Sequence, residues 1–562
     1  MDTANKYCRI LFDILEKKGV KDVICSPGSR NVPLLLAAAS REGLKKHFVV
    51  DEREAGFLGL GISMVSRKPV ALVCTSGTAL LNYAPAVAEA YYQGVPLIVI
   101  SADRPLQWID QDDSQTIRQD GAFSNFVKKS YSIPAYSGES SELEWYVDRL
   151  VNDALMKSRE GKPGPVHINI HIGEPLGLKC RRDNADPRII TMISADTLAN
   201  KETLKDLANE LSGAKVLLVA GFMAPDSSLQ KAVTEFSRFP NVVVMAETIS
   251  NLHLNPEVHA IDSVLTAYDE KILDGVAPDI VISLGGALVS RKLKEYLRRN
   301  SKRCRHWAVG FAYFTSDPFM SLERRIQLDP TRFFKGINSA LRKIGIQNDF
   351  SSTWKSLRLK ALQAKNNFIR DCGWSELKAF EIILKNIHGD INLYLSNGTP
   401  IRYAQLIEYK LPHASYCNRG VSGIDGTTVT AIGGAIAYKG ASLLITGDLS
   451  LAYDLGALNL KETPRNFKIV VIDNQGGGIF RFIPSTSDLP ECEEYLCQNP
   501  EIPLKELAEA FDWNYFECND EASLQKVYPK FLSHTSKSIL KVSCPGLSGA
   551  SLLKAYMALK AF

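Results

Sequence analysis

The chain has 562 residues, of which 45% are hydrophobic and 23% are charged, the mixture of an ordinary globular protein. Its 66 basic and 62 acidic residues leave a net charge of only +4, so neither nucleic-acid binding nor attraction to an anionic membrane surface is expected. A chain of this length is enough for roughly three domains.

The N-terminal residues and the cysteines indicate a cytoplasmic protein. Residues 1–19 have an amphipathic helical pattern with charges throughout, and they lack the uninterrupted apolar stretch of a signal peptide. No run of about 18 apolar residues occurs, so membrane insertion is not expected. The 11 cysteines are scattered, Cys492 and Cys497 being the closest pair, and no CxxC motif occurs. This pattern favours free thiols in a reducing compartment and no structural zinc.

Residues 1–180 alternate apolar strands with helical segments. The predicted strands are residues 20–26, 48–50, 70–74, 97–100 and 166–170. Helices are predicted between them, for example over residues 34–40 and in the alanine-rich segment that ends at residue 93. Strands that alternate with helices indicate a parallel α/β sheet, which we expect to form the first domain.

Two further α/β segments follow. Residues 190–345 contain predicted strands at 216–220, 242–245, 280–284 and 306–309, a Rossmann-like pattern without a GxGxxG motif, which gives little support for nucleotide binding. Residues 351–369 predict a charged connecting helix. Residues 370–562 contain predicted strands at 393–395, 415–417, 442–446, 469–472 and 539–542. The sequence therefore predicts an α/β protein with parallel sheets and domains at 1–180, 190–345 and 370–562.

The predicted strands of the first domain end in polar residues. A tight turn at residues 26–30 presents Arg30, and residues 51–53 open a helix with Glu52 in its first turn. Residues 75–78 cap a helix whose N-terminus could face an anion, and residues 102–105 place Arg104. A single arginine is more often part of a surface ion pair, and an acidic residue at a helix start is commonly structural. These residues alone do not establish a site.

Residues 447–480 carry the most specific pattern. A predicted buried strand ends at Gly447-Asp448, a helical segment follows, and a second strand ends before Asn474 and three glycines. Because parallel strands bring their carboxyl ends to one edge of a sheet, Asp448 and Asn474 would lie side by side. A carboxylate, an amide oxygen and a glycine carbonyl suit a hard divalent cation. The glycines at 476–478 would let the backbone approach a pyrophosphate closely.

This pattern resembles the diphosphate-binding motif of thiamine-diphosphate enzymes, with Leu449 and Asp473 in place of the usual glycine and asparagine. The resemblance implies thiamine diphosphate as cofactor and Mg²⁺ or Mn²⁺ as metal. The implied metal ligands are Asp448, Asn474 and Gly476, and the implied cofactor contacts are Glu52, Ser76, Gly77, Ile424, Gly447, Asp448, Leu449, Asn474, Gly476 and Gly478.

Within that superfamily, an N-terminal module contributes a glutamate to the aminopyrimidine and a C-terminal module binds the metal and diphosphate. Glu52 would be that glutamate and the catalytic residue, and Ile424 or a neighbouring residue would support the bent cofactor. The two modules normally come from different subunits, which implies at least a homodimer.

Motifs along nearly the whole chain narrow the resemblance. They are SPGSR at 26–30, DERxAGF at 51–57, TSGTA at 75–79, ADRP at 102–105, QTIRQ at 115–119, NRGxSGIDG at 418–426 and GGGIF at 476–480. Together they are similar to the 2-succinyl-5-enolpyruvyl-6-hydroxy-3-cyclohexene-1-carboxylate synthases of menaquinone biosynthesis, a family of transferases. The resemblance implies decarboxylation of 2-oxoglutarate and conjugate addition of the succinyl carbanion equivalent to isochorismate, in a homotetramer built from dimers.

Such substrates bring several carboxylates, which guanidinium groups bind in a bidentate manner. The substrate-binding residues implied by the resemblance are Arg30, Arg104, Gln115, Arg291, Lys292, Arg402, Arg419, Ile479, Phe480 and Ile483. We assign Arg402 with Arg291 or Lys292 to 2-oxoglutarate or to a shared region. Arg30, Arg104 and Gln115 are assigned to isochorismate, and Arg419 to either substrate. Gly398 and Ser114 replace the serine and asparagine common in the family, which removes a hydroxyl contact to substrate.

Two alternatives stay open. Another 2-oxoacid decarboxylase or an acetolactate-synthase-like enzyme would share the cofactor residues, although pyruvate has one carboxylate and does not need the arginine set. A non-catalytic homologue would bind the cofactor without releasing CO₂. The retained Glu52, Asp448 and Asn474 argue against that second alternative.

Overall fold

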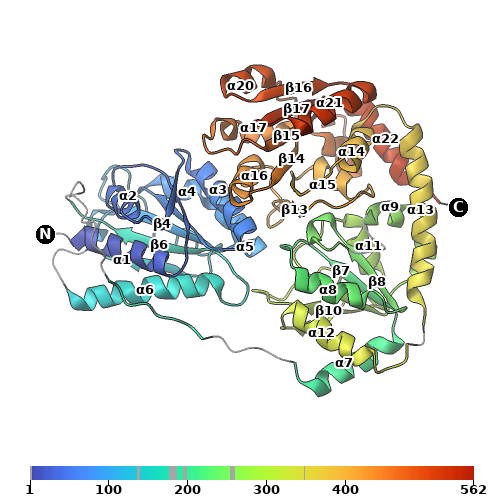
Figure 1. Cartoon of the computed structure of the whole chain (residues 1–562), viewed down its shortest axis with the longest axis horizontal. Helices are drawn as coiled ribbons and strands as arrows, with labels where there is room; N and C mark the ends of the chain where they lie inside the picture. The colour runs from blue at the N-terminus through green and yellow to red at the C-terminus, as the bar shows by residue number, and fades with distance from the viewer. Residues whose placement is uncertain are drawn as a thin grey trace. The chain divides into compact units, whose positions relative to one another are not determined.

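Three sheets of parallel strands form the framework of the protein, in a computed structural model that describes residues 3–135, 140–174, 176, 186–193, 199–253, 260–346 and 348–561. The chain divides into two compact units (Figure 1). Unit 1 comprises Met1–Ser194, Asn418–Lys439 and Tyr453–Phe467, and unit 2 comprises Ala195–Cys417, Gly440–Ala452 and Lys468–Phe562. The α/β fold class is as predicted, and the boundaries at 1–180, 190–345 and 370–562 stay a prediction.

The sheet of unit 1 has the strand order β2-β1-β3-β4-β6-β5. Its strands are β1 (Asp22–Cys25), β2 (Lys45–Phe48), β3 (Val70–Cys74), β4 (Leu97–Asp103), β5 (Ser130–Ile133) and β6 (Val166–His171). One face packs against α1 (Thr3–Lys17), α2 (Val32–Ala39) and α6 (Ser141–Arg159). The opposite face carries α3 (Glu52–Ser66), α4 (Thr78–Asn82) and α5 (Ala84–Gln93). A Cβ on Gly59 of α3 would lie 2.5 Å from Leu72 of β3, so this helix lies directly on the sheet.

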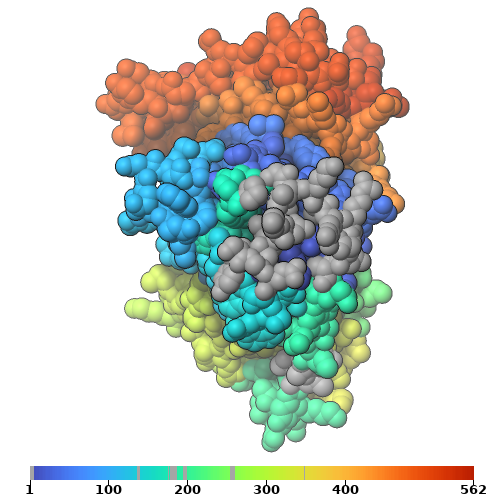
Figure 2. Space-filling view, turned by 90° about the vertical axis from the view of Figure 1, so that its left-hand side faces the viewer, coloured from blue at the N-terminus to red at the C-terminus, as the bar shows by residue number. Residues whose placement is uncertain are grey.

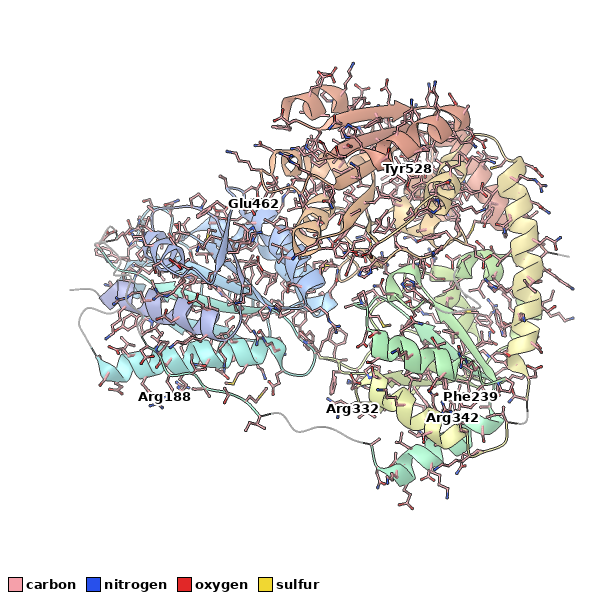
Figure 3. The ribbon with its side chains drawn as sticks, in the orientation of Figure 1. Arg188, Phe239, Arg332, Arg342, Glu462 and Tyr528 are labelled. Atoms are coloured by element: carbon pink, nitrogen blue, oxygen red, sulfur yellow. The ribbon has the colours of Figure 1, made fainter. Side chains whose placement is uncertain are left out.

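The prediction of a strand at 48–50 is wrong, because the edge strand β2 spans Lys45–Phe48. Its sequence, KKHF, lacks the apolar run from which a strand was expected, and Phe48 and Val50 are 66% and 80% exposed. The buried residue is His47, whose ring nitrogens contact Asp22 and Glu462 (Glu462 is labelled in Figure 3). A histidine held between two carboxylates therefore fixes the edge strand.

A five-stranded sheet in unit 2 has the order β11-β10-β9-β7-β8. Its strands are β7 (Val216–Ala220), β8 (Val242–Ala246), β9 (Ile280–Leu284), β10 (Arg305–Val309) and β11 (Leu322–Ile326). One face packs against α7 (Lys201–Gly213), α8 (Ser227–Phe236) and α12 (Pro330–Leu341). The other packs against α9 (Ile261–Thr266), α10 (Glu270–Gly275), α11 (Arg291–Arg299) and α13 (Phe350–Asp371).

The second sheet of unit 2 has the order β13-β12-β14-β15-β17-β16, which repeats the chain-order pattern of the unit 1 sheet. Its strands are β12 (Ile391–Leu395), β13 (Ala414–Tyr416), β14 (Ala441–Gly447), β15 (Phe467–Asp473), β16 (Asn514–Cys518) and β17 (Ser538–Ser543). Its core includes residues of α14 (Glu376–Lys385), α15 (Thr399–Ala404), α21 (Glu521–Ser533) and α22 (Gly546–Ala558), among them the buried Tyr528 labelled in Figure 3. This repetition agrees with the strand–helix rhythm that the first and last segments share in sequence.

Shorter elements complete the fold. They are α16 (Thr427–Ala437), α17 (Asp448–Tyr453), α18 (Gly478–Phe482), α19 (Pro484–Ser487), α20 (Leu504–Ala510), 3₁₀ turns at Leu106–Trp108, Thr248–Ser250 and Leu455–Asn459, and a π-helical turn at Cys492–Leu496. Residues 104–120, light blue in Figure 2, lie mostly exposed on the surface of unit 1. None of the helices in the described ranges is long and apolar enough to cross a membrane.

Candidate active site

The carboxyl ends of two neighbouring strands in unit 2 bring Asp448 and Asn474 together. β14 ends at Gly447, β15 ends at Asp473, and the two strands are neighbours in the sheet. The Asp448 carboxylate accepts hydrogen bonds from the backbone N–H of Gly476 at 2.7 Å and of Leu449 at 2.7 Å. Burial raises the pKa of Asp448 despite these hydrogen bonds, since ionising a buried carboxyl is costly without a cation.

Asn474 has an oxygen that fits a metal ligand. Its side chain is buried, and its Nδ2 donates to Glu376, which fixes the orientation of the amide. Among the described residues no hydrogen-bond partner reaches the buried Oδ1 atom. A buried carbonyl oxygen without a donor is costly, and a hard cation would compensate it. Asp448 and Asn474 therefore fit the predicted metal.

Glu376 at the start of α14 supports this edge and was not predicted. Burial raises its pKa to about 7, although hydrogen bonds from Asn474 and Tyr403 favour its charged form. A Cβ on Gly478 would lie 2.2 Å from Asn474 Nδ2 and 3.2 Å from Glu376 Oε1. Glycine at 478 is therefore needed for the Asn474–Glu376 contact.

The turn at residues 476–478, here called the glycine turn, needs its glycines for steric reasons. Gly476 and Gly477 have φ of 75° and 61°, in the left-handed region that favours glycine. A Cβ on Gly476 would lie 1.9 Å from the carbonyl oxygen of Gln498, and one on Gly477 would lie 2.7 Å from that of Leu496. The turn thus lies directly against the segment 496–498, which leaves no room for a side chain at Gly476 or Gly477.

Arg481 holds the glycine turn from within and was also not predicted. It is 6% exposed, and its Nη1 donates to the carbonyl oxygens of Asn474 at 2.8 Å and Gly476 at 2.9 Å. Glu493 pairs with the same guanidinium at 2.9 Å. The arginine therefore fixes the carbonyl of Gly476, a predicted metal ligand, and the carbonyl of Asn474 beside it, a role with no motif in the sequence.

Unit 2 also contains a cavity of about 780 Å³, which is lined by several of the predicted substrate-binding residues. Basic side chains outnumber acidic ones in its lining. Among the described residues that line it, five were predicted, namely Arg291, Lys292, Arg402, Ile479 and Ile483, whereas Phe480 is not part of the lining. Arg291 and Lys292 begin α11 and both pair with Glu295, at 2.7 Å and 3.1 Å. The cavity is suited to an anionic ligand with an apolar portion.

The cavity connects to the metal edge through α15. Thr399 and Tyr403 line the cavity, and both hydrogen-bond to Glu376, the partner of Asn474. Gly398 precedes this helix with φ of 90°, and a Cβ there would meet no atom within 4 Å. The departure from the serine common in the family therefore coincides with a left-handed backbone position, where a non-glycine residue would be strained.

In unit 1, Glu52 begins helix α3. Asp51 caps the helix, and its side chain accepts from the backbone N–H of Arg53 at 2.8 Å and of Glu54 at 3.3 Å. Burial, with a contribution from Asp51, raises the pKa of Glu54 to about 7. The cap fixes the position at which the Glu52 side chain leaves the helix.

Helix α3 packs closely against α16, which follows the motif at residues 418–426 that contains Arg419 and Ile424. A Cβ on Gly61 would lie 2.0 Å from the carbonyl oxygen of Thr430, and one on Gly433 would lie 2.2 Å from that of Leu58. Glu89 accepts hydrogen bonds from the N–H groups of Gly420 and Val421 at 2.6 Å. These contacts place Arg419 and Ile424 in unit 1 with Glu52, and Ile424 is 38% exposed.

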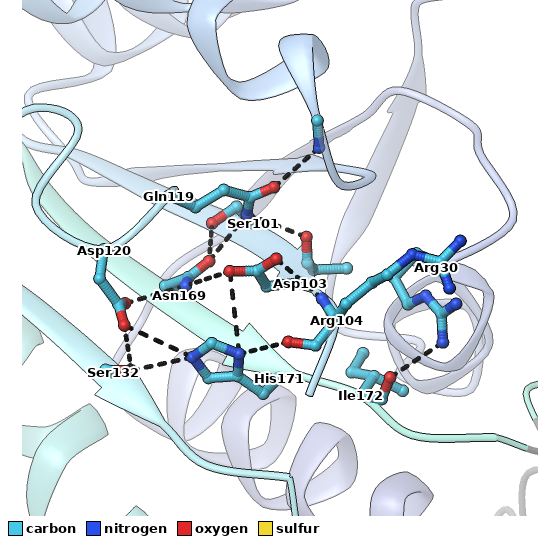
Figure 4. Close-up of polar contacts among 12 residues, drawn as sticks. Arg30, Ser101, Asp103, Arg104, Gln119, Asp120, Ser132, Asn169, His171 and Ile172 are labelled. Atoms are coloured by element: carbon cyan, nitrogen blue, oxygen red, sulfur yellow. Dashed lines mark hydrogen bonds and ion pairs between the residues drawn. The ribbon is translucent and has the colours of Figure 1, made fainter. Parts of the chain in front are cut away.

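Three sheet-edge turns of unit 1 bring Arg30 and Arg104 together (Figure 4). Arg30 is 5% exposed and donates to the carbonyl oxygen of Ile172 at 3.0 Å. Burial, together with the charge of Arg104, lowers the pKa of Arg30. Arg104 pairs with Asp113 at 2.7 Å and donates to the Ser114 carbonyl at 3.1 Å. Two adjacent guanidinium groups are suited to binding a carboxylate.

A buried polar network supports these turns, and sequence reasoning missed its central residue, Gln119. Gln119 accepts from the N–H of Gly77 at 2.8 Å and donates to Asn169 at 2.9 Å (Figure 4). Gln115 has φ of 53°, and its backbone lies 3.3 Å from a Cβ built on Gly77. The buried Ser76 precedes Gly77 in this turn. The predicted residues Ser76, Gly77, Gln115 and Arg104 thus lie in one region of unit 1.

The predicted residues therefore fall into two sets. Unit 1 contains Glu52, Arg30, Ser76, Gly77, Arg104, Gln115, Arg419 and Ile424. Unit 2 contains Arg291, Lys292, Arg402, Gly447, Asp448, Leu449, Asn474, Gly476, Gly478, Ile479, Phe480 and Ile483. The roles assigned to these residues stay predictions.

Comparison with known proteins decides the family. Residues 5–122 match the family described as "Thiamine pyrophosphate enzyme, N-terminal TPP binding domain". A 2-succinyl-5-enolpyruvyl-6-hydroxy-3-cyclohexene-1-carboxylate synthase of Porphyromonas gingivalis is 39% identical, over 98% of this chain and 96% of the relative. The chain belongs to this synthase family.

Other relatives carry the same name. The Flavobacterium johnsoniae synthase is 35% identical over 97% of both chains, and the Bacteroides thetaiotaomicron synthase is 34% identical over 93% of this chain and 92% of its own. The predicted family, α/β fold class and enzyme class are confirmed, and the chain is a thiamine-diphosphate-dependent synthase.

Proposed function

We propose that the protein decarboxylates 2-oxoglutarate and adds the resulting succinyl unit to isochorismate by conjugate addition. The products are 2-succinyl-5-enolpyruvyl-6-hydroxy-3-cyclohexene-1-carboxylate and CO₂. The name that the relatives share supports this reaction, because it states the same product. The observation that carries the proposal for this chain is the basic cavity of unit 2, whose wall residues Thr399 and Tyr403 join it to Asn474 through Glu376.

Asp448, Asn474 and the carbonyl of Gly476 would hold Mg²⁺ or Mn²⁺, and the glycine turn would contact the cofactor diphosphate. The Oδ1 of Asn474, which has no partner among the described residues, and the hydrogen bond from the Gly476 N–H to Asp448 support this assignment. Gly447, Leu449 and Gly478 complete the proposed cofactor contacts of unit 2. When bound, thiamine diphosphate supplies the electron sink that decarboxylation of a 2-oxoacid requires.

Glu52 would exchange a proton with N1′ of the aminopyrimidine, and this makes it the proposed catalytic residue. Its place at the capped start of α3 supports the role, because the cap limits where the carboxylate can lie. Ser76, Gly77 and Ile424 are the proposed cofactor contacts of unit 1. The N–H of Gly77 already donates to Gln119, so the contact from Gly77 would come from its other atoms.

Guanidinium and ammonium groups would bind the substrate carboxylates. Arg291, Lys292 and Arg402 line one cavity, which supports their assignment to 2-oxoglutarate or to a shared region. The proximity of Arg30 to Arg104, beside Gln115, supports their assignment to isochorismate. Ile479 and Ile483 would form the apolar wall, and Arg419 would serve either substrate. Phe480, which was predicted for the same wall, is not part of the cavity lining.

Product mass tests the reaction. The protein is incubated with thiamine diphosphate, Mg²⁺ and 2-oxoglutarate, with and without isochorismate. The proposal predicts CO₂ release and, only with isochorismate, a product whose mass equals isochorismate plus 2-oxoglutarate minus CO₂. A product formed from pyruvate instead would identify an acetolactate-synthase-like enzyme. Bound cofactor without CO₂ release would identify a non-catalytic homologue.

We also propose that the active protein is at least a homodimer, and a homotetramer by the resemblance. The exposed apolar residues Phe48 and Val50 in unit 1 support an association surface. The predicted compartment is the cytoplasm, which is supported by thiols that are not joined in disulfides among the described cysteines. Sedimentation at micromolar concentration measures the assembly, and a monomer that is fully active would contradict it.

A further inference from the structure

Two cysteines and a glutamate form a cluster beside the glycine turn. Cys492, Glu493 and Cys497, here called the dithiol cluster, have ligand atoms that all lie within 4.8 Å of one another. Both cysteines are buried, at 4% and 6% exposure, whereas the Glu493 side chain is 48% exposed. The cluster therefore has one side open to solvent, through which a small ion could enter.

A π-helical turn brings the two thiols together. In an α-helix, residues five apart point in directions about 140° apart. Here Cys492–Leu496 forms a π-helical turn, and the N–H of Cys497 donates to the carbonyl of Cys492 at 3.0 Å. π-helical turns are rare and occur frequently at functional sites. The spacing C-x₄-C carries no metal motif in sequence, which explains why no zinc site was expected from it.

The distance between the sulfurs matches a metal site. The two Sγ atoms lie 3.7 Å apart. A disulfide would bring them to about 2.05 Å. Two sulfurs bound at about 2.3 Å to one tetrahedral ion lie roughly 3.8 Å apart. The observed separation therefore fits shared coordination without movement of the thiols.

We propose that the dithiol cluster binds a thiophilic divalent cation of the zinc class. Cys492 and Cys497 supply two sulfur ligands, Glu493 supplies a carboxylate oxygen, and water takes the fourth position. Two thiolates select zinc-class ions over Mg²⁺. The cluster thus differs in ligand chemistry from the oxygen site at Asp448 and Asn474.

The cluster is joined to the glycine turn by Arg481. Glu493 pairs with this guanidinium, which also donates to the carbonyl oxygens of Asn474 and Gly476. A cation that takes the Glu493 carboxylate competes with Arg481 for its hydrogen bonds to that carboxylate. The net charge of the cluster does not change, because both thiols lose their protons when the cation binds. The Sγ of Cys497 also lies 3.8 Å from the carbonyl oxygen of Gly477, to which its thiol donates. A bound cation displaces this thiol proton, so the contact with the glycine turn is lost. Occupancy of the cluster by a cation therefore weakens the affinity of the protein for thiamine diphosphate. This effect on the cofactor rests on the proposed function, whereas the cation site itself does not.

Cobalt(II) tests the site. The full chain is kept reduced by a thiol-free reductant and saturated with Mg²⁺, and Co²⁺ is then added. We expect a thiolate-to-cobalt charge-transfer absorption band that saturates at one equivalent of Co²⁺ in the wild type. The control variant Cys372→Ser should give the same band, because Cys372 lies outside the cluster. The band should be lost in Cys492→Ser and Cys497→Ser. No band in the wild type, or an unchanged band in the serine variants, overturns the site.

Glu493→Gln keeps both thiols and provides a second test if the serine variants do not fold. It should weaken Co²⁺ binding at least about tenfold, because a neutral amide is a poorer ligand than a carboxylate. Unchanged Co²⁺ affinity overturns Glu493 as a ligand.

Calorimetry with thiamine diphosphate in excess Mg²⁺ tests the effect on the glycine turn. Zinc-saturated wild type and zinc-free Glu493→Gln should both bind the cofactor several-fold more weakly than zinc-free wild type. Equal affinities overturn the effect on the glycine turn but leave the cobalt result standing. Failure of zinc-free wild type to bind thiamine diphosphate would instead contradict the proposed function.

Discussion

At the scale of single residues, Asp448 and Asn474 carry the clearest chemistry of unit 2. We predict that Asp448→Ala abolishes metal-dependent binding of thiamine diphosphate, with at least about a hundredfold loss of affinity, because the cation is the main charge that compensates the diphosphate. Calorimetry with cofactor and Mg²⁺ measures this. Asp473→Asn, which restores the asparagine usual in thiamine-diphosphate enzymes, is the matched control and should bind normally. Wild-type affinity in Asp448→Ala would mean that the metal lies elsewhere.

Glu52 is the second residue whose role can be isolated. We predict that Glu52→Gln keeps the fold and the metal site but slows proton exchange at the thiazolium C2 of bound cofactor at least about a hundredfold, since the amide cannot exchange a proton with N1′. Hydrogen–deuterium exchange followed by NMR gives the rate. Cofactor affinity is measured on the same sample, so that a binding defect is separated from a defect in activation. An exchange rate equal to the wild type would exclude this role for Glu52.

Sequence reasoning found the residues that belong to local motifs and missed those that act across the chain. Asp448 and Asn474 could be predicted, because a strand–helix–strand pattern places both at one sheet edge. Glu376 and Gln119 could not, since each acts through a partner distant in sequence, Asn474 and Gly77 respectively. Arg481 binds backbone carbonyls, which leave no trace in residue identity.

At the scale of elements, the contact between α3 and α16 depends on glycine. We predict that Gly61→Ala destabilises unit 1 by roughly 1–3 kcal/mol, because the added Cβ meets the Thr430 carbonyl, which backbone hydrogen bonding holds in place. Gly213→Ala, at a helix end with no atom within 4 Å, is the control and should be neutral or slightly stabilising. Urea unfolding compares the two. Equal stability of both variants would show that α3 and α16 can move apart at the Gly61 contact with no loss in the free energy of unfolding.

The contribution of helix α3 to stability also depends on pH, because of Glu54. Burial raises the pKa of this carboxyl from 4.5 to about 7. When the pKa of a carboxyl is higher in the folded state than in the unfolded state, the group contributes its full share of the free energy of unfolding at pH values below its unfolded-state pKa. This contribution is lost as the pH rises through the folded-state pKa. We predict that Glu54→Gln matches the wild type at pH 4.5 and is more stable at pH 8 by on the order of 1 kcal/mol or more, because ionising this buried carboxyl destabilises the folded state. Urea midpoints at the two pH values test this. A pH dependence of the wild type that persists unchanged in Glu54→Gln would assign the effect to another group.

At the scale of the whole molecule, the three parallel sheets were predictable, and the composition of the two units was not. Alternating strands and helices indicated the α/β class, and even the repeated strand order of the first and third sheets agrees with the shared rhythm of their sequences. The inclusion of residues 418–439 in unit 1 depends on the close packing of α3 on α16 and on the hydrogen bonds of Glu89. Such contacts join segments more than 300 residues apart, as the Glu89–Gly420 pair does, so no local pattern reveals them.

The central claim is that this chain selects a dicarboxylate 2-oxoacid. Pyruvate lacks the distal carboxylate of 2-oxoglutarate, so it would not make the charged contacts that this carboxylate makes with the basic groups of the cavity. The loss of a specific polar contact of this kind lowers kcat/KM strongly. The most direct measurement is kcat/KM for the two 2-oxoacids under saturating isochorismate, thiamine diphosphate and Mg²⁺. The account predicts a preference for 2-oxoglutarate of at least about a hundredfold. Equal kcat/KM values for 2-oxoglutarate and pyruvate would contradict it.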